Sequence, residues 1–167
     1  MAKFTVKAFI LALMLFFANA CDFNKAFIAL NSDKDYKFEF NGFEKRLHLN
    51  TQKPYALVFF TKDCGVCKEQ IKILNSLNQI YNFDFFIILN DASNKEDARL
   101  WAENKDLFLP LFYEKRAVNF LSRAVGSIYA VPVIVFVDKK GILGKKFIGL
   151  TPQSVLEKEL TNFNDLH

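Results

Sequence analysis

Two cysteines separated by two residues, Cys64 and Cys67, are the residues of this chain best placed to do chemistry. They follow a continuous apolar run at 55–60, which predicts a strand buried on both faces. Apolar residues then recur at spacings of three and four, which predicts a helix from Gly65 onward. A helix N-terminus stabilises a thiolate, which is the reactive form of cysteine. One helical turn brings the second sulfur within bonding reach of the first, so the pair can cycle between dithiol and disulfide.

A Cys-x-x-Cys pair can also bind zinc, attach haem or form a structural disulfide, and the first two need further residues in set positions. A zinc site needs two more ligands, but the only histidines are His48 and the terminal His167, and the third cysteine is Cys21 near the N-terminus. Covalent haem attachment needs a histidine directly after the second cysteine, where this chain has Lys68. A purely structural disulfide stays open because exported proteins use them, although so short a loop constrains the unfolded chain little. We expect no metal and no bound cofactor.

The first twenty residues have the parts of a bacterial secretory signal: a basic start, an apolar run at 8–17, and small residues at Ala18 and Ala20. The run is too short to span a bilayer, which needs about 20 residues. It also lacks the polar face that the alternative, a buried amphipathic helix, would show. The small residues before Cys21 resemble the lipobox of bacterial lipoproteins, in which the cysteine is acylated and begins the mature chain. Cleavage by ordinary signal peptidase, which leaves Cys21 unmodified, is the alternative.

The length of 167 residues fits one domain with accessory segments. We expect a signal peptide at 1–20, a polar-leaning tether at 21–35 and a single domain at 36–167. The segment from Ala26 to Leu30 could instead pack on the domain. Removing the signal peptide takes away two lysines and no acidic residue, which lowers the net charge from +4 to +2. The remaining lysines are interspersed with acidic residues, so a nucleic-acid-binding stripe is not indicated.

The domain alternates predicted strands and helices. Alternating apolar and charged residues on either side of Asn41-Gly42 predict a hairpin at 36–49. Further strands are predicted at 55–60, 83–89, 132–137 and 142–148, with a loop or edge strand at 107–112. Helices are predicted at 65–81, 91–106, 117–124 and 153–163, of which 91–106 is polar and expected to face solvent. This order predicts an α/β fold with one central mixed sheet flanked by helices and an N-terminal β-hairpin extension.

Over residues 53–160 the sequence resembles the thioredoxin superfamily. The similarity is carried by the apolar strand that leads into Cys64-Gly65-Val66-Cys67, and by Ala130-Val131-Pro132 before another apolar strand. The resemblance implies a thioredoxin-like fold in which Pro132 has a cis peptide bond and lies against the cysteine pair. It also implies that the backbone of Val131 pairs with a bound peptide. Gly65 and Val66 are expected to belong to the same substrate-binding surface.

A closer resemblance is to exported, membrane-tethered thioredoxin-like proteins of the TlpA and cytochrome-c-maturation kind. The leading hairpin, the helical stretch at 91–106 and the anchor all fit that group. The chain departs from its usual pattern in having Asp63 and Val66 in place of a tryptophan and a proline. It also has Gln70 in place of a glutamate three residues after the second cysteine. Thioredoxin itself has a buried acidic residue on the preceding strand, and this chain has Val58 at the corresponding position.

The residues and the resemblance together predict a thiol–disulfide oxidoreductase. Cys64 is expected to be the exposed nucleophile that attacks a substrate disulfide, and Cys67 the thiol that resolves the mixed disulfide. Lys62 and Lys68 favour the Cys64 thiolate and Asp63 opposes it, so the net effect stays open. We expect the domain to reduce exported proteins, apocytochromes c among them, and a membrane redox partner to recycle the pair. The expected location is the periplasmic face of a bacterial cell envelope; the alternative is a non-catalytic peptide-binding or chaperone module with a structural disulfide.

Overall fold

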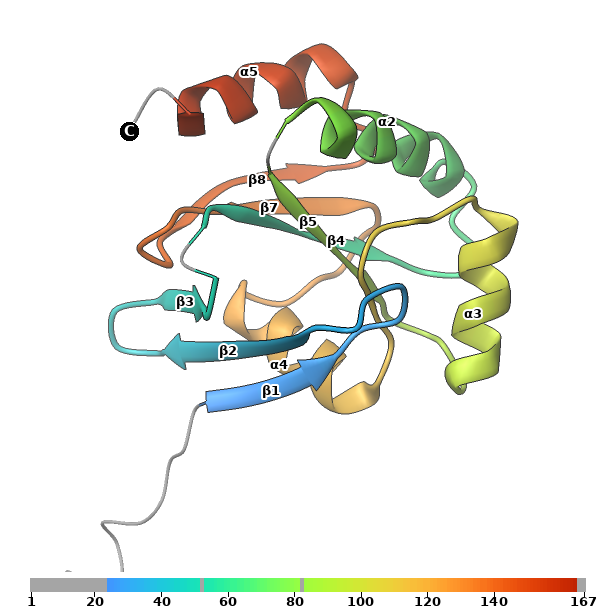
Figure 1. The fold of residues 1–167 in the computed structure, drawn as a ribbon, viewed down its shortest axis with the longest axis horizontal. Helices are drawn as coiled ribbons and strands as arrows, with labels where there is room; N and C mark the ends of the chain where they lie inside the picture. The colour runs from blue at the N-terminus through green and yellow to red at the C-terminus, as the bar shows by residue number, and fades with distance from the viewer. Residues whose placement is uncertain (1–23, 52, 82, 165–167) are drawn as a thin grey trace, which may run out of the picture.

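The computed structural model describes residues 24–51, 53–81 and 83–164, and these residues form two sheets and four helices (Figure 1). The predicted signal peptide and Cys21 lie outside the described residues. The elements in chain order are β1 (Asn24–Ile28), β2 (Asp35–Asn41), β3 (Arg46–Leu49), β4 (Tyr55–Phe60), α2 (Cys67–Ile80), β5 (Asp84–Leu89), α3 (Lys95–Asn104), β6 (Leu111–Phe112), α4 (Lys115–Ala124), β7 (Val133–Val137), β8 (Leu143–Ile148) and α5 (Gln153–Asn164).

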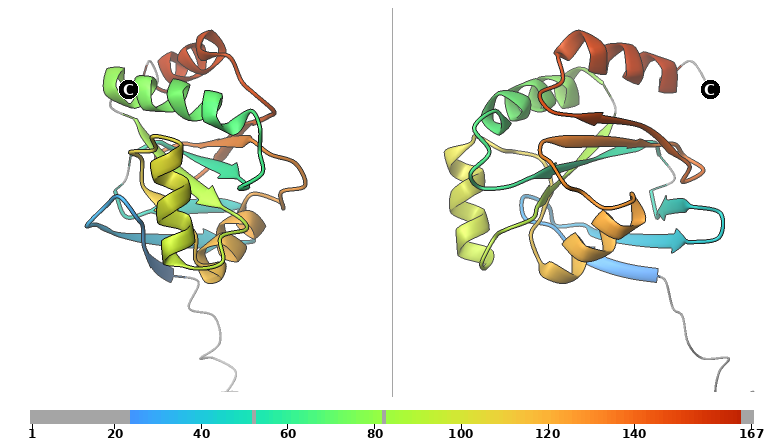
Figure 2. Two further views of the ribbon diagram at one scale, coloured as in Figure 1. Left: turned by 90° about the vertical axis from the view of Figure 1, so that its right-hand side faces the viewer. Right: turned by 180° about the vertical axis from the view of Figure 1, so that it is seen from behind.

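The central sheet has five strands in the order β6-β5-β4-β7-β8. Strands β4, β5 and β6 run parallel, whereas β7 is antiparallel to both β4 and β8, so the sheet is mixed as predicted. All six residues of β4 are buried, because this strand lies at the centre of the sheet and both of its faces are covered. Helices α2 and α5 cover one face, and α4 with the smaller sheet covers the other (Figures 1 and 2). The predicted α/β architecture is therefore confirmed.

The smaller sheet has the order β1-β2-β3 and is antiparallel throughout. Strands β2 and β3 form the predicted hairpin, but β1 adds a third strand that was not predicted from the apolar pattern. Phe27 of β1 is buried and its ring packs near those of Phe38, Phe112 and Phe120. Of the two possibilities left open for Ala26 to Leu30, packing on the domain is therefore the one observed. A tether can then include only the few residues between Cys21 and β1.

The two sheets share one core rather than forming separate units. The hydroxyl of Tyr55 in β4 donates a 2.7 Å hydrogen bond to the carbonyl of Leu47 in β3, and burial raises the pKa of that hydroxyl well above its usual value. A second link is the bridge between Leu30 and Leu111, at the edge strand β6. The buried apolar residues form one cluster on each face of the central sheet, and all of them lie between Phe27 and Leu160. A fragment that begins at residue 22 therefore contains the whole core and is expected to fold by itself.

The polar segment predicted as a solvent-facing helix at 91–106 is α3, which begins at Lys95. Asn94 caps it, since its side-chain oxygen accepts a 2.9 Å hydrogen bond from the backbone N–H of Asp97. One face of α3 is buried against the core through Ala98, Trp101 and Ala102, so the expectation of a wholly solvent-facing helix was wrong. No helix among the described residues is both long and apolar enough to cross a membrane.

Candidate active site around Cys64 and Cys67

The cysteine pair lies where β4 leads into α2. The backbone N–H of Cys64 donates to the carbonyl of Thr61, and that of Cys67 donates to the carbonyl of Cys64, so residues 61–67 form consecutive tight turns. Helix α2 begins at Cys67 rather than at Gly65, and no side chain caps its N-terminus. The two cysteines are joined in a disulfide with their Cα atoms 5.4 Å apart. The predicted Cys-x-x-Cys disulfide at a helix start is therefore present.

The two sulfur-bearing side chains differ in their access to solvent. Cys64 is 8% exposed and Cys67 is 0% exposed. Between them, Gly65 and Val66 are exposed, and the Val66 side chain is 45% exposed. An incoming sulfur atom can therefore approach Cys64 alone, which is the order of access that a nucleophile and a resolving thiol need. The exposure of Cys64 is nevertheless small, so substrate must approach closely along the surface of the turn.

Val131 and Pro132 approach the same end of the sheet from β7. The Val131–Pro132 bond is cis, as the resemblance implied, and Pro132 is buried. In the antiparallel register of β4 and β7, Val133 lies opposite Phe59, which places Pro132 level with the end of β4. Val131 packs against the core cluster that includes both cysteines. The structure thus brings the predicted peptide-binding segment to the strand end from which the cysteine turn departs.

Gln70 connects this site to the loop between β8 and α5. Its side chain is 0% exposed, and its Oε1 accepts a 2.7 Å hydrogen bond from the backbone N–H of Thr151. Its Nε2 donates a longer hydrogen bond, of 3.4 Å, to the carbonyl of Thr151. The N–H of Gly149 in the same loop donates a 2.8 Å hydrogen bond to the carbonyl of Pro132. Gln70 therefore helps to hold α2, the cis-proline segment and the β8–α5 loop in one arrangement.

Sequence reasoning noted Gln70 only as a departure from a family pattern and did not predict this role. Its partner Thr151 lies 81 residues away along the chain, so no local pattern could reveal the pairing. The available signal was the position itself. A polar side chain three residues after Cys67 lies on the same face of α2 as that buried cysteine, and a buried amide must find hydrogen-bond partners.

Lys62, just before the cysteine pair, is bound to two acidic residues of the neighbouring segment. The ammonium group of Lys62 lies 2.8 Å from a carboxylate oxygen of Asp97, and its backbone N–H donates to the carboxylate of Asp91. The hydrogen bond between the two side chains raises the pKa of Lys62 and lowers the pKa of Asp97. Of the two lysines expected to favour a Cys64 thiolate, Lys62 is therefore paired with a carboxylate. The position of β4 at which thioredoxin has a buried acid is occupied here by Val58, whose side chain is fully buried.

The described part of the chain contains no group of three or more His, Cys, Asp or Glu side chains arranged to hold a metal ion. His48 lies on β3, in the smaller sheet.

Comparison with known proteins identifies the family. Residues 45–164 match the family model of the thioredoxin-like domain. The chain belongs to the thioredoxin-like family. This confirms the thioredoxin superfamily and the thioredoxin-like fold inferred from the sequence. The family and the cysteine pair together support the enzyme class of thiol–disulfide oxidoreductases.

Solved structures of this family have the same fold at low sequence identity. A Chlorobium tepidum protein assigned as the thiol:disulfide interchange protein DsbE is 17% identical, with a TM-score of 0.64 over 83% of this chain and 92% of that one. The exposed lipoprotein thioredoxin of Streptococcus pneumoniae is 16% identical, with a TM-score of 0.63 over 83% and 98%. The thioredoxin domain of a Bacteroides vulgatus thiol-disulfide oxidoreductase is 19% identical, with a TM-score of 0.58 over 82% and 93%. No curated protein matched the sequence.

Proposed function

We propose that this protein is an exported thiol–disulfide oxidoreductase that reduces disulfides in other exported proteins. The observation that supports this most strongly is the Cys64–Cys67 disulfide itself, at the start of α2, with only Cys64 accessible to solvent. A bond in this position can open and re-form with little change in the rest of the domain, because both cysteines lie within one turn of chain.

In the proposed reaction the reduced pair supplies two electrons. The Cys64 thiolate attacks one sulfur of a substrate disulfide, the substrate S–S bond breaks, and the released substrate thiolate takes a proton from solvent. Cys67 then loses its proton and attacks the Cys64 sulfur. The mixed disulfide breaks, the second substrate thiolate leaves and is protonated, and the Cys64–Cys67 disulfide forms. A membrane dithiol protein that reduces this disulfide completes the cycle.

The surface around Cys64 is suited to an extended peptide. Val66 presents an apolar side chain between the two cysteines, and Leu150 in the β8–α5 loop is also an exposed apolar residue. The half-buried Val131 precedes the cis-proline, and we assign its backbone to pairing with the substrate chain. Gly65, Val66, Val131 and Pro132 are therefore our proposed substrate-binding residues. Reduced apocytochrome c is one product that such a site can deliver.

We further propose that the protein is held at the periplasmic face of the cell envelope. Residues 1–20 would direct export, and Cys21 would be acylated after cleavage of that signal. The similarity to an exposed lipoprotein thioredoxin supports this location. Because β1 begins at Asn24, the domain would follow its lipid anchor with almost no intervening tether.

Reduction of the interchain disulfides of insulin by a fragment spanning residues 22–167 tests the proposed activity. Wild-type protein with dithiothreitol is expected to accelerate insulin precipitation, and Cys64→Ser is expected to abolish the acceleration. Cys67→Ser is expected to accumulate a mixed disulfide with substrate through Cys64, visible in a non-reducing gel. If both variants retained full activity, the pair would not be catalytic. The small exposure of Cys64 also suits a structural disulfide, and wild-type inactivity in this assay would favour that alternative.

A further inference from the structure

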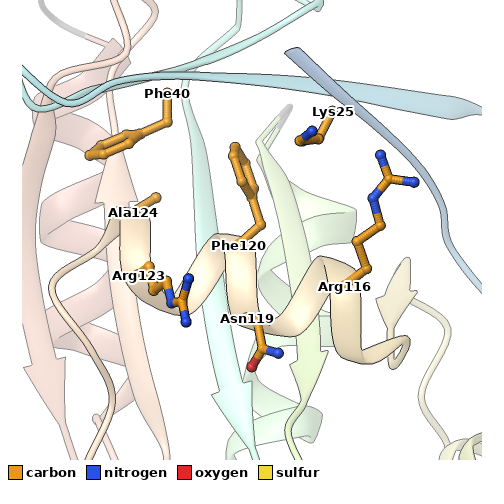
Figure 3. Close-up of a pocket in the computed structure, with 7 residues that line it drawn as sticks. All are labelled: Lys25, Phe40, Arg116, Asn119, Phe120, Arg123 and Ala124. Atoms are coloured by element: carbon orange, nitrogen blue, oxygen red, sulfur yellow. The ribbon is translucent and has the colours of Figure 1, made fainter. Parts of the chain in front are cut away.

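A pocket of about 480 Å³ lies between α4 and the smaller sheet, on the opposite face of the central sheet from α2 and α5 (Figures 1 and 3). Its apolar part is formed by Phe40 from β2 and by Phe120 and Ala124 from α4. Both phenylalanine rings are only partly buried, so they present apolar surface to whatever occupies the pocket. The remaining lining residues are polar or positively charged: Lys25, Arg116, Asn119 and Arg123.

Three cations line this pocket from two elements that are far apart in sequence. Arg116 and Arg123 are seven residues apart on α4, so they lie on the same side of the helix two turns apart. Lys25 is two residues before Phe27 in β1, so both side chains lie on the same face of the strand. Phe27 packs near Phe120, so this is the face towards α4. None of the three side chains makes an ion pair or a hydrogen bond with another described residue. Three positive charges therefore line an apolar pocket without an ion-pair partner among residues 24–51, 53–81 and 83–164.

The pocket is also close, along the chain, to the proposed site of acylation. Only four peptide units separate Cys21 from Lys25, and an extended chain advances at most about 3.6 Å per residue. Lys25 therefore lies within about 15 Å of an acylated Cys21, whatever path the chain takes. An acyl group on Cys21 would bring this face of the domain to the level of the phospholipid headgroups. This step rests on the lipidation under the proposed function.

We propose that this pocket binds an anionic phospholipid of the membrane in which the protein is anchored. The phosphate would accept hydrogen bonds from the guanidinium groups of Arg116 and Arg123 and pair with the ammonium of Lys25, because guanidinium geometry suits phosphate oxygens. The glycerol and upper acyl chain would contact Phe40 and Phe120. A lipid bound here holds the α4 face against the bilayer and leaves the α2 face, where the redox pair lies, accessible to substrates.

Vesicle flotation with the unacylated fragment 22–167 tests this proposal independently of Cys21. The fragment is expected to float with vesicles of phosphatidylcholine containing 30% phosphatidylglycerol, and not with vesicles of phosphatidylcholine alone. Arg116→Gln combined with Arg123→Gln is expected to weaken binding about 30-fold, since each basic residue near an anionic surface contributes about fivefold. Lys95→Gln combined with Lys158→Gln removes the same charge from exposed positions on α3 and α5, and is expected to change binding less than threefold.

Equal weakening by the two double variants would show that net charge and not the pocket governs binding, and would overturn the proposal. Absence of flotation with phosphatidylglycerol vesicles would also overturn it, as would binding to polyglutamate without binding to these vesicles. Glycerol 3-phosphate at millimolar concentration serves as the free-phosphate probe, and tighter binding of this ion than of the vesicles would exclude a membrane lipid as the occupant. Insulin reduction by the Arg116→Gln/Arg123→Gln protein is expected to equal the wild-type rate, which separates failure of this proposal from failure of the proposed activity.

Discussion

Replacing Gln70 by leucine removes the only side-chain hydrogen bonds that join α2 to the β8–α5 loop within the described part of the chain. Leucine approximates the volume of glutamine, so the variant tests hydrogen bonding more than packing. The N–H of Thr151 loses a 2.7 Å bond and the carbonyl of Thr151 loses a 3.4 Å bond, at a residue that is itself buried. An unsatisfied buried backbone group costs about 1–3 kcal/mol, and the longer bond is the weaker one. We therefore expect Gln70→Leu to lower the free energy of unfolding by about 2–3 kcal/mol.

Gln70→Glu tests the same two hydrogen bonds through the pH dependence of stability. A protonated glutamic acid can accept from the N–H of Thr151 and donate to its carbonyl, as glutamine does, whereas a buried carboxylate cannot donate. Burial therefore raises the pKa of the introduced carboxyl group in the folded state above the usual value of about 4.3. The variant is expected to match the wild type below about pH 4. It then loses about 1.4 kcal/mol of stability per pH unit as the pH rises from the unfolded pKa to the raised folded pKa.

Urea denaturation of oxidised fragment 22–167 at pH 4 and pH 7.5 measures both effects. Gln79 is an exposed residue of the same helix, so Gln79→Leu and Gln79→Glu are matched controls that are expected to change stability by less than about 0.5 kcal/mol. A Gln70→Leu protein as stable as its control would refute the role assigned to Gln70. A Gln70→Glu protein whose loss of stability is the same at both pH values would refute the proposed pairing of its side chain with both backbone groups.

Three other variants test further parts of the structure. Phe38→Ala is expected to lower the free energy of unfolding by about 3–5 kcal/mol, measured in urea, because Phe38 is a fully buried ring at the contact between the two sheets. Gly141→Ala is expected to lower the melting temperature more than Gly126→Ala: both glycines have positive φ, but only at Gly141 would a Cβ lie 3.0 Å from the backbone of β3. Equal effects would contradict that close approach. Asp97→Asn is expected to lower the pKa of Lys62, followed by NMR titration. The folded-state pKa of Asp97 is lowered, so its ion pair stabilises the wild-type fold above the unfolded pKa of the carboxyl group. This stability is lost as the pH falls through the folded pKa. The Asp97→Asn protein is expected to lack this part of the pH dependence of its unfolding free energy.

The sequence predicted the elements whose residues interact mainly with their own neighbours or lie deep in the core. The apolar runs at 55–60 and 132–137 lack alternation because β4 and β7 are covered on both faces, and both were recognised for that reason. Strand β1 was missed because Phe27 is the only buried side chain described between Lys25 and Ile28, in a segment that otherwise has polar or exposed side chains. Its stability comes from pairing with β2 and packing on α4, which a local pattern cannot reveal.

The site was predictable in its sulfur chemistry and not in its supporting contacts. Cys64, Cys67 and Pro132 belong to motifs that are visible in the sequence. The role of Gln70 depends on a loop 81 residues away, and the pairing of Lys62 with Asp97 joins residues 35 positions apart. The cationic pocket likewise needs β1 and α4 to be adjacent, and that adjacency exists only in the folded chain.

The reduction potential of the Cys64–Cys67 pair tests the central claim most directly. Fragment 22–167 is equilibrated in glutathione redox buffers, or in dithiothreitol buffers for lower potentials, and the oxidised fraction is measured by thiol alkylation and mass spectrometry. A potential between about −270 and −120 mV, the range of working thiol–disulfide exchange proteins, is the predicted result. A potential below about −300 mV would mark a structural disulfide and contradict the proposed function.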